Sequence, residues 1–151
     1  MNVYVAHPIT GSTRDQVLGY YARIQAALIP NGFTVYWPMI AKGPLKPETT
    51  YKSTGYDAFP QSTNHAIRNR DRFMVKHCDI LYLDLTGTTT VSIGCVMELA
   101  WASDAGKHIV VIMAKENIHR HAFVLECSDI IFETEAEALV YMERFGKRIA
   151  E

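Results

Sequence analysis

The chain has 151 residues, of which 48% are hydrophobic and 21% are charged, and its formal net charge is −1. This length suits one compact domain, residues 1–151, with enough chain to bury a full core. The near-neutral charge gives no basic field for a nucleic-acid polymer, and the sequence contains no apolar run long enough to cross a membrane.

The N-terminus lacks the charged and apolar regions of a secretory signal. The three cysteines, Cys78, Cys95 and Cys127, are odd in number and lack the spacing of metal ligands. Such a pattern argues against a disulfide framework and against structural zinc. We therefore expect a cytoplasmic protein.

In chain order, short β-branched and apolar runs alternate with segments of helical periodicity. A connection within residues 116–127 has partly helical character, and Gly106 is placed to end the third helix. The predicted strands are residues 3–6, 33–37, 79–85, 108–113 and 129–133, and the predicted helices are 17–28, 63–77, 93–105 and 135–148.

This alternation predicts an α/β fold, a single doubly wound domain with a five-stranded parallel sheet flanked by helices, as in flavodoxin-like or Rossmann-like proteins. The buried strands are apolar on both faces, as a parallel sheet requires. Residues 38–61 have no periodicity, and a loop of that length in a small domain is more often functional than neutral.

Polar residues gather after the strands, where an open parallel sheet binds its ligands. Ser92 and Gly94 begin the third helix, whose free N–H groups and dipole favour an anion, although Ser92 also suits a plain N-cap. Glu98 follows about a turn and a half later in an apolar helix. It is either a functional carboxylate or the partner of a buried Arg or Lys.

Other polar residues allow two interpretations each. Asp71 either lies on a solvated charged face or turns inward as a second carboxylate. Arg14 suits a phosphate contact or an ordinary first helical turn, and Trp37 suits stacking on a flat ring or core packing. His119 and His121 lack the additional ligand residues that a metal site needs.

Four stretches together resemble the nucleoside 2-deoxyribosyltransferase superfamily over residues 3–133. They are "YVAHPI", the second-helix aspartate, "CDILYLDL" and "SIGCVMELAWASDAGK", of which the Ser-x-Gly-x-x-x-Glu-Leu pattern is the most specific. The superfamily includes base-exchanging deoxyribosyltransferases, 2′-deoxynucleoside 5′-monophosphate N-hydrolases and related CMP N-glycosidases.

The resemblance implies roles for three residues. Glu98 matches the glutamate that attacks the anomeric carbon, and Asp71 matches an aspartate that serves the base and its proton transfers. Ser92 stands where the transferases commonly have an aspartate and the monophosphate hydrolases have serine, so it favours a 5′-phosphate. The implied substrate-binding residues are Tyr4, His7, Pro8, Ile9, Thr10, Gly11, Ser12, Arg14, Trp37, Ser92, Gly94, His119 and His121.

Two departures from the family pattern count against different subgroups, one against the transferases and one against the monophosphate hydrolases. Transferases often use an asparagine near the fifth strand, borrowed from a neighbouring subunit, where this chain has residues 128–130 as Ser-Asp-Ile. The monophosphate hydrolases have a more basic and glycine-rich first loop than "PITGSTRD".

The expected function is therefore cleavage of the N-glycosidic bond of a (2′-deoxy)nucleoside 5′-monophosphate through a glutamate nucleophile. Base exchange between deoxynucleosides and a non-catalytic nucleotide sensor are the alternatives. A generic Rossmann dehydrogenase is not expected, because no G-x-G-x-x-G motif follows the first strand, and a P-loop is absent too. No cofactor or metal is implied. We expect a homodimer or higher homo-oligomer that shares pockets between subunits, with His119 or His121 completing a neighbour's pocket.

Overall fold

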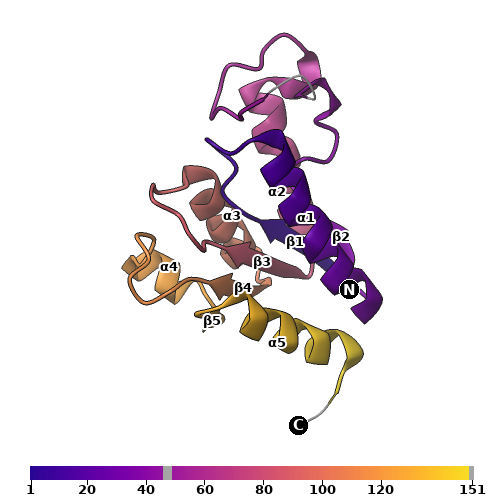
Figure 1. Ribbon diagram of the computed structural model, residues 1–151, viewed down its shortest axis with the longest axis vertical. Coiled ribbons are helices and arrows are strands. Elements are labelled where there is room, and N and C mark those ends of the chain that lie inside the picture. Colours follow the sequence, from indigo (N-terminus) through magenta and orange to yellow (C-terminus); the bar gives the residue numbers. More distant parts are fainter. Residues whose placement is uncertain (46–48, 150–151) are drawn as a thin grey trace.

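The computed structural model describes residues 1–45 and 49–149, and within them five parallel strands form one sheet in the order β2-β1-β3-β4-β5. Figure 1 shows the sheet crossing the middle of the molecule. The strands are β1 (Asn2–Ala6), β2 (Thr34–Tyr36), β3 (Ile80–Asp84), β4 (His108–Ile112) and β5 (Ile130–Phe132). This order is that of flavodoxin-like doubly wound proteins, so the predicted fold class is confirmed.

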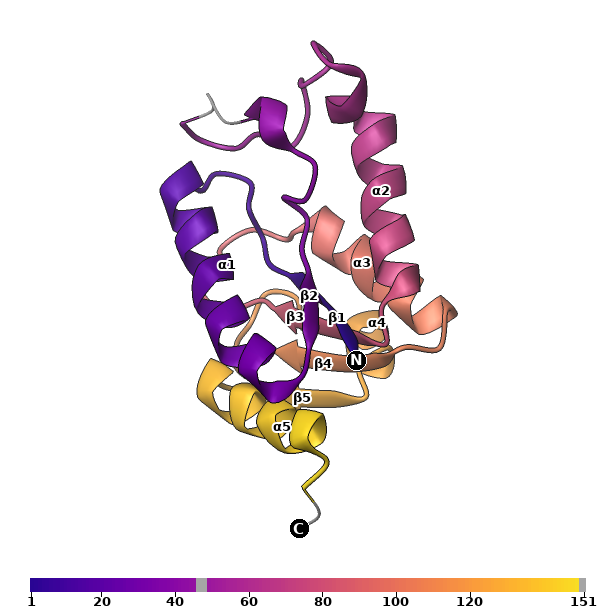
Figure 2. The same ribbon diagram turned by 90° about the vertical axis from the view of Figure 1, so that its right-hand side faces the viewer.

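Helices cover both faces of the sheet, as Figure 2 shows, with α1 and α5 on one side and α2, α3 and α4 on the other. Their ends agree with the predicted helices within about three residues. The bounds are α1 (Arg14–Leu28), α2 (Asn64–His77), α3 (Ile93–Asp104), α4 (Ala122–Glu126) and α5 (Glu135–Lys147), with short 3-10 turns η1 (Ile29–Asn31), η2 (Gly43–Leu45) and η3 (Pro60–Ser62).

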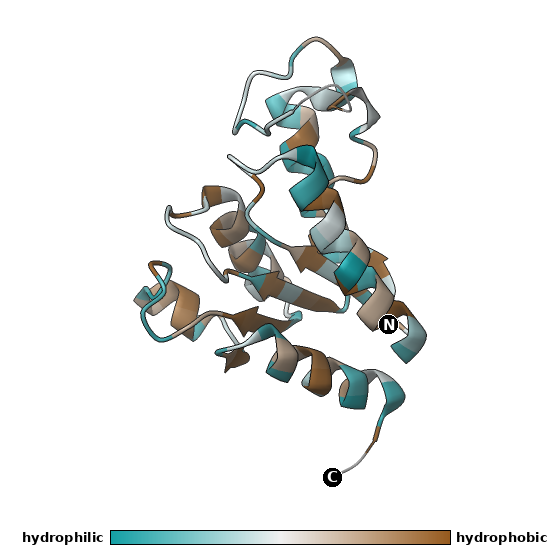
Figure 3. Cartoon of the chain, in the orientation of Figure 1, coloured by the Kyte–Doolittle hydropathy of each residue, from teal (hydrophilic) through white to brown (hydrophobic). Residues whose placement is uncertain are grey.

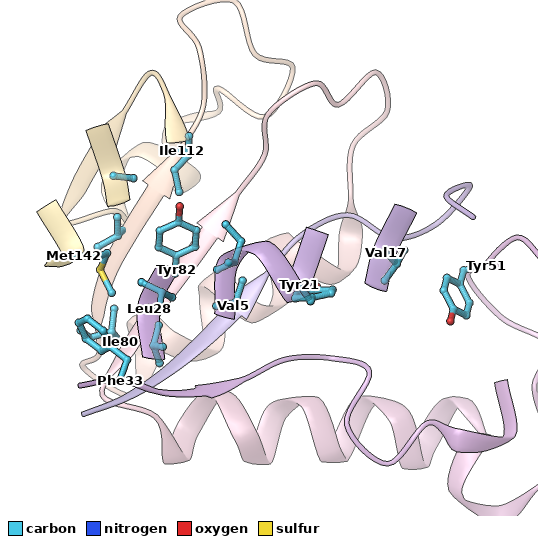
Figure 4. Close-up of a cluster of buried hydrophobic side chains, with 14 of the residues drawn as sticks. Val5, Val17, Tyr21, Leu28, Phe33, Tyr51, Ile80, Tyr82, Ile112 and Met142 are labelled. Carbon is cyan, nitrogen blue, oxygen red and sulfur yellow. The ribbon is translucent and has the colours of Figure 1, made fainter. Parts of the chain in front are cut away.

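The central strands are apolar on both faces because both faces are buried, and Figure 3 shows them as the most hydrophobic part of the chain. On the α1 and α5 side, Val5, Tyr82 and Ile112 of the sheet pack against Tyr21 and Met142 of the helices (Figure 4). A second cluster fills the opposite face between the sheet and α2, α3 and α4.

Local capping sets the ends of the helices. Thr13 and Thr134 each cap a helix through a reciprocal capping box, with Gln16 and Glu137 respectively. Gly106 follows α3 with a φ of +63°, a conformation that glycine adopts without the cost of a Cβ. The predicted role of Gly106 at the end of this helix is therefore confirmed.

The long segment, residues 38–61, is packed structure in its described parts, 38–45 and 49–61. Leu45, Tyr51 and Tyr56 are buried in the cluster on the α1 side of the sheet. Thr50 pairs with Thr13 in an isolated antiparallel bridge, which joins the segment to the start of α1. The segment therefore lies beyond the carboxyl ends of the strands, in the upper part of Figure 2.

Candidate active site

A cavity of about 490 Å³ opens where β1 and β3 end, at the point where the strand order reverses direction. Doubly wound sheets bind their ligands at such switch points. The loop after β1, the long segment, α2 and the start of α3 all contribute to it. The lining residues are His7, Pro8, Ile9, Thr10, Pro38, Lys42, Leu45, Tyr51, Lys52, Ser53, Tyr56, Ile67, Asp71, Thr90, Val91, Ser92, Ile93, Gly94, Cys95 and Glu98.

Glu98 projects into this cavity from the second turn of α3 and is only 7% exposed. Burial raises the pKa of its carboxyl group to about 8, because the ionised form loses its hydration. The Tyr4 hydroxyl opposes this shift in pKa by donating a hydrogen bond of 2.7 Å to Oε1. The negative charge of Asp71 raises the pKa further, while the positive charge of Lys42 lowers it.

Tyr4 itself is fully buried in the sheet and does not line the cavity. Its hydrogen bond fixes the position of the Glu98 carboxyl group and favours the carboxylate. The structure thus places Tyr4 behind Glu98, where it supports that side chain.

Asp71 turns inward from α2 and lines the cavity, where it meets Lys42 of the long segment. Lys42 Nζ lies 3.4 Å from Asp71 Oδ2, and both side chains are largely buried. Burial raises the pKa of Asp71 and lowers the pKa of Lys42, and in each case the partner's charge opposes the shift. Burial outweighs the attraction between the two groups, so both are pushed toward their neutral forms.

The start of α3 forms another wall of the cavity through Ser92 and Gly94. The Ser92 hydroxyl oxygen accepts a hydrogen bond from the Cys95 N–H at 3.4 Å, as an N-cap does. The hydroxyl proton can still be donated elsewhere, so capping and anion binding are compatible. The first N–H groups of a helix have no intrahelical partner, which makes this wall suitable for an anion.

His119 does not line the cavity but supports the start of α3 from behind. It is 2% exposed, and its Nε2 accepts a hydrogen bond of 2.8 Å from the Ser92 N–H. Nδ1 therefore carries the proton and donates to Asn117 Oδ1 at 3.0 Å. Burial lowers the pKa of His119, in keeping with this neutral form. The structure places His119 within its own chain as a support, which differs from the expected substrate contact.

In the loop after β1, four of the expected residues line the cavity: His7, Pro8, Ile9 and Thr10. His7 Nδ1 lies 3.0 Å from the Asp84 carbonyl oxygen, which can only accept, so Nδ1 carries a proton. The His7 ring also stacks on Tyr20 with centroids 4.0 Å apart. These two contacts hold the imidazole against the end of β3.

The next residues of this loop lie outside the cavity lining. The Gly11 N–H donates to the Tyr51 carbonyl oxygen at 2.9 Å, and the Ser12 N–H donates to Ile9 at 3.1 Å. The Arg14 N–H donates to the Thr49 carbonyl oxygen at the first turn of α1. The Gly11 and Arg14 N–H groups thus bind the long segment, and the Ser12 N–H closes a turn within the loop. These backbone donors are engaged within the chain, which differs from the expected substrate contacts.

Trp37 and His121 also lie away from the lining. The Trp37 ring packs 4.7 Å from the Tyr21 ring and joins the hydrophobic cluster, as the core-packing interpretation proposed. His121 is the N-cap of α4 and accepts the Phe123 N–H. Neither side chain touches the cavity, so we do not assign them to substrate contacts within one subunit.

Sequence reasoning missed the contribution of the long segment, above all Lys42, Tyr51, Lys52, Ser53 and Tyr56. A signal was present, since this aperiodic stretch contains three lysines and two tyrosines that are hard to explain as a neutral loop. No periodicity indicates which of them turn inward. Their positions depend on contacts with α1 and α2 that are distant in sequence.

A larger surface hollow of about 810 Å³ lies elsewhere, against α5 and β5. It is mainly apolar and includes Met1 and Ile130, which are at the amino ends of strands, opposite to the end where ligands bind in this fold. The smaller cavity contains the two buried carboxyl groups. We therefore take the smaller one as the candidate active site.

Three further features of the described residues bear on the sequence expectations. No helix in the described ranges is long and apolar enough to span a membrane. Within the same ranges, no cluster of three His, Cys, Asp or Glu side chains could hold a metal ion. Cys78, Cys95 and Cys127 are all free thiols.

Residues 3–147 match the sequence profile of a family described as nucleoside 2-deoxyribosyltransferase. The structure is similar to that of the CMP N-glycosidase BcmB of Clostridium botulinum, with a TM-score of 0.61, 19% identity, and coverage of 96% of this chain and 99% of that one. A conserved protein from Enterococcus faecalis V583 gives a TM-score of 0.63 at 16% identity, with 96% and 98% coverage. At these identities, the structural likenesses show the fold alone. No curated protein sequence matches significantly.

We expect Glu98→Gln to stabilise the protein increasingly as the pH rises. The folded-state pKa of Glu98, about 8, lies above the value of about 4.5 for an unperturbed glutamate. The folded wild type therefore retains a proton that the unfolded chain releases, and its stability falls through this window by up to about 1.4 kcal/mol per pH unit. A neutral glutamine removes that dependence.

Urea unfolding at pH 5 and pH 8 would measure this effect. The two proteins should be nearly equal at pH 5, and the variant should be more stable at pH 8. Glu126→Gln, at an exposed position, is the matched control and should follow the wild type. If the difference in unfolding free energy between the variant and the wild type is the same at both pH values, the Glu98 carboxyl group is well hydrated.

Proposed function

Because this chain belongs to the nucleoside 2-deoxyribosyltransferase family, a family of enzymes that act on nucleosides or nucleotides, we propose that it cleaves the N-glycosidic bond of a (2′-deoxy)nucleoside 5′-monophosphate. The proposal is carried by one observation. A buried carboxyl group, Glu98, faces a cavity whose adjoining wall is the start of the same helix. A carboxyl group and the free N–H groups of a helix start are thus held at fixed separation on one element, which supports the proposal.

In the proposed reaction, the Glu98 carboxylate attacks the anomeric carbon of the sugar. The bond from that carbon to the base nitrogen breaks, and its electron pair leaves with the base, to which Asp71 gives a proton. Water then attacks the same carbon and releases Glu98 as a carboxylate, while Asp71 recovers a proton from the water. The raised pKa of Asp71 supports its role as the proton donor.

The 5′-phosphate would lie against the start of α3. Ser92 offers a hydroxyl donor, and the neighbouring helical N–H groups and the helix dipole favour negative charge. Lys52, which lines the same cavity on the long segment, adds a cation that sequence reasoning had not assigned. A carboxylate at position 92 would repel the phosphate.

Base exchange is the second candidate, since the family description names it. It follows the same first step, and a second base then takes the place of water. A catalytically silent sensor is less well supported, because it would hold Glu98 in a salt bridge. Among residues 1–45 and 49–149, the ion pairs do not include Glu98, and its carboxyl group accepts from the neutral Tyr4 hydroxyl.

We also propose a homo-oligomer in which a second subunit covers the cavity. Val91 and Ile93 line the cavity and yet are 55% and 76% exposed. Large apolar side chains that are exposed at the edge of a site are suited to covering by a partner. Because His119 is engaged within its own chain, His121 is the remaining histidine of that connection that could reach a neighbour.

Glu98→Ala should lower kcat by about a thousandfold or more, since it removes the nucleophile while leaving the fold. In the wild type, kcat/KM should have a bell-shaped pH profile that falls toward pH 9, because the attack needs the Glu98 carboxylate and departure of the base needs protonated Asp71. Both the loss of kcat and the pH profile are measured by incubating a deoxynucleoside monophosphate with enzyme at pH 5 to 9 and quantifying the released base by chromatography. A profile that is flat from pH 6 to 9, or near-normal turnover by Glu98→Ala, contradicts the mechanism.

Ser92→Asp should abolish the preference for a 5′-monophosphate over the free deoxynucleoside. Two charge-assisted hydrogen bonds favour the monophosphate by roughly a hundredfold or more in the wild type, and an aspartate replaces them with repulsion. The measurement is kcat/KM for one deoxynucleoside and its monophosphate in both proteins. Ser103→Asp, at an exposed position near the far end of α3, is the control. A wild type that prefers the unphosphorylated nucleoside would favour the base-exchanging alternative.

Ile93→Gln should weaken the proposed oligomer and reduce activity in parallel. Analytical ultracentrifugation at micromolar concentration, together with the base-release assay, measures the two effects. Ile29→Gln replaces an isoleucine that is 55% exposed at the far end of α1, and it should change neither. A fully active wild-type monomer would rule out a pocket shared between subunits.

A further inference from the structure

Lys42 is a buried lysine with no place in the mechanism so far. It is 6% exposed, lines the cavity, and reaches it from the long segment just before η2. Burying an ammonium group is unfavourable unless acceptors surround it. Within the described residues, the one acceptor in contact with Nζ is Asp71 Oδ2, at 3.4 Å.

The Lys42–Asp71 pair has unused hydrogen-bonding capacity. The ammonium has three N–H donors, and the contact with Asp71 uses one of them. On the other side of the pair, Asp71 Oδ1 is buried without a hydrogen-bond partner. Both residues line the same cavity as Glu98, so the free donors and the free oxygen are available to a molecule bound there.

The chemistry of the leaving base determines what this pair recognises. When Asp71 protonates the base, Oδ1 acts as an O–H donor, and Lys42 beside it is a donor as well. Two adjacent donors match a base edge with two adjacent acceptors. Cytosine has such an edge at N3 and O2, and guanine and hypoxanthine have one at N7 and O6. Adenine instead places an amino donor beside N7, and thymine has an N–H beside each carbonyl.

Resting on the function proposed above, we propose that Lys42 determines base specificity. Its ammonium donates to the carbonyl oxygen of the base while Asp71 delivers its proton to the adjacent ring nitrogen. Lys42 keeps its own protons and stabilises the negative charge that develops on the carbonyl oxygen as the base leaves. The pair therefore favours cytosine and 6-oxopurine nucleotides over adenine and thymine nucleotides.

The experiment compares wild type, Lys42→Met, Lys42→Arg and Lys76→Met. Methionine keeps the length of the side chain without its donors, and arginine retains donors and charge. Lys76 is the control, because it lies on α2 and pairs with Asp104 at the opposite end of α3. Release of base is measured for dCMP, dGMP, dIMP, dAMP and dTMP, and thermal unfolding verifies that each variant is folded.

We expect Lys42→Met to lower kcat/KM for dCMP, dGMP or dIMP by about 10- to 100-fold, the loss that removing one charge-assisted hydrogen bond produces. The change for dAMP should be no more than about threefold, so that the base preference collapses. Lys42→Arg should restore part of the preference, and Lys76→Met should match the wild type.

A second arm separates this inference from the proposed function. Calorimetry measures binding of the same five nucleotides to Glu98→Gln, with and without Lys42→Met. If the wild type cleaves none of them, the proposed function fails, and the binding selectivity still decides the role of Lys42. Equal losses for all five bases, or a wild-type preference for adenine or thymine, would overturn the role of Lys42 while leaving the proposed reaction intact. If no nucleotide is cleaved or bound, both are wrong.

Discussion

The site depends on keeping one carboxyl group, that of Glu98, largely out of water. From Ile93 to Ala102, α3 is otherwise apolar, and it packs against α2 and the sheet, so its inward face would ordinarily carry only hydrophobic side chains. The Tyr4 hydroxyl compensates for part of the lost hydration, and burial still leaves the pKa of the carboxyl group near 8. A carboxylate that is poorly hydrated is costly for the fold and reactive toward an electron-poor carbon. In the proposed reaction, stability and reactivity are therefore set by the same burial.

Much of this arrangement could be predicted from the sequence, because the relevant signals are local. The apolar runs and helical periodicities located every strand and long helix within a few residues, and their alternation gave the sheet. Glu98 stood out because a carboxylate within an apolar helix is unusual, and the start of α3 was visible from Ser92 and Gly94. Once the sheet is assembled, the carboxyl ends of β1 and β3 necessarily bring these residues to one edge.

The remainder could not be predicted, because it depends on contacts between residues distant in sequence. Lys42 reaches Asp71 across 29 positions, and an aperiodic segment gives no indication of which side chains turn inward. Gly11 and Ser12 of the first loop were expected to bind substrate, yet the Gly11 N–H already donates to the Tyr51 carbonyl oxygen of the long segment. His119 was expected to contact the substrate, but its hydrogen bond with Ser92, 27 positions away in sequence, places it behind the start of α3.

Contacts between residues distant in sequence also anchor two walls of the cavity. His119 holds the backbone of Ser92 from behind, while the Thr13–Thr50 bridge holds the segment that faces it. From the N-cap Ser92 to Glu98, six steps of the helix span about 9 Å, and a helix does not stretch. In the proposed reaction, the substrate carries its phosphate and its anomeric carbon on one sugar ring. A rigid helix with an anion site at its start and a carboxylate a turn and a half later can therefore bind the phosphate and align the reacting carbon together.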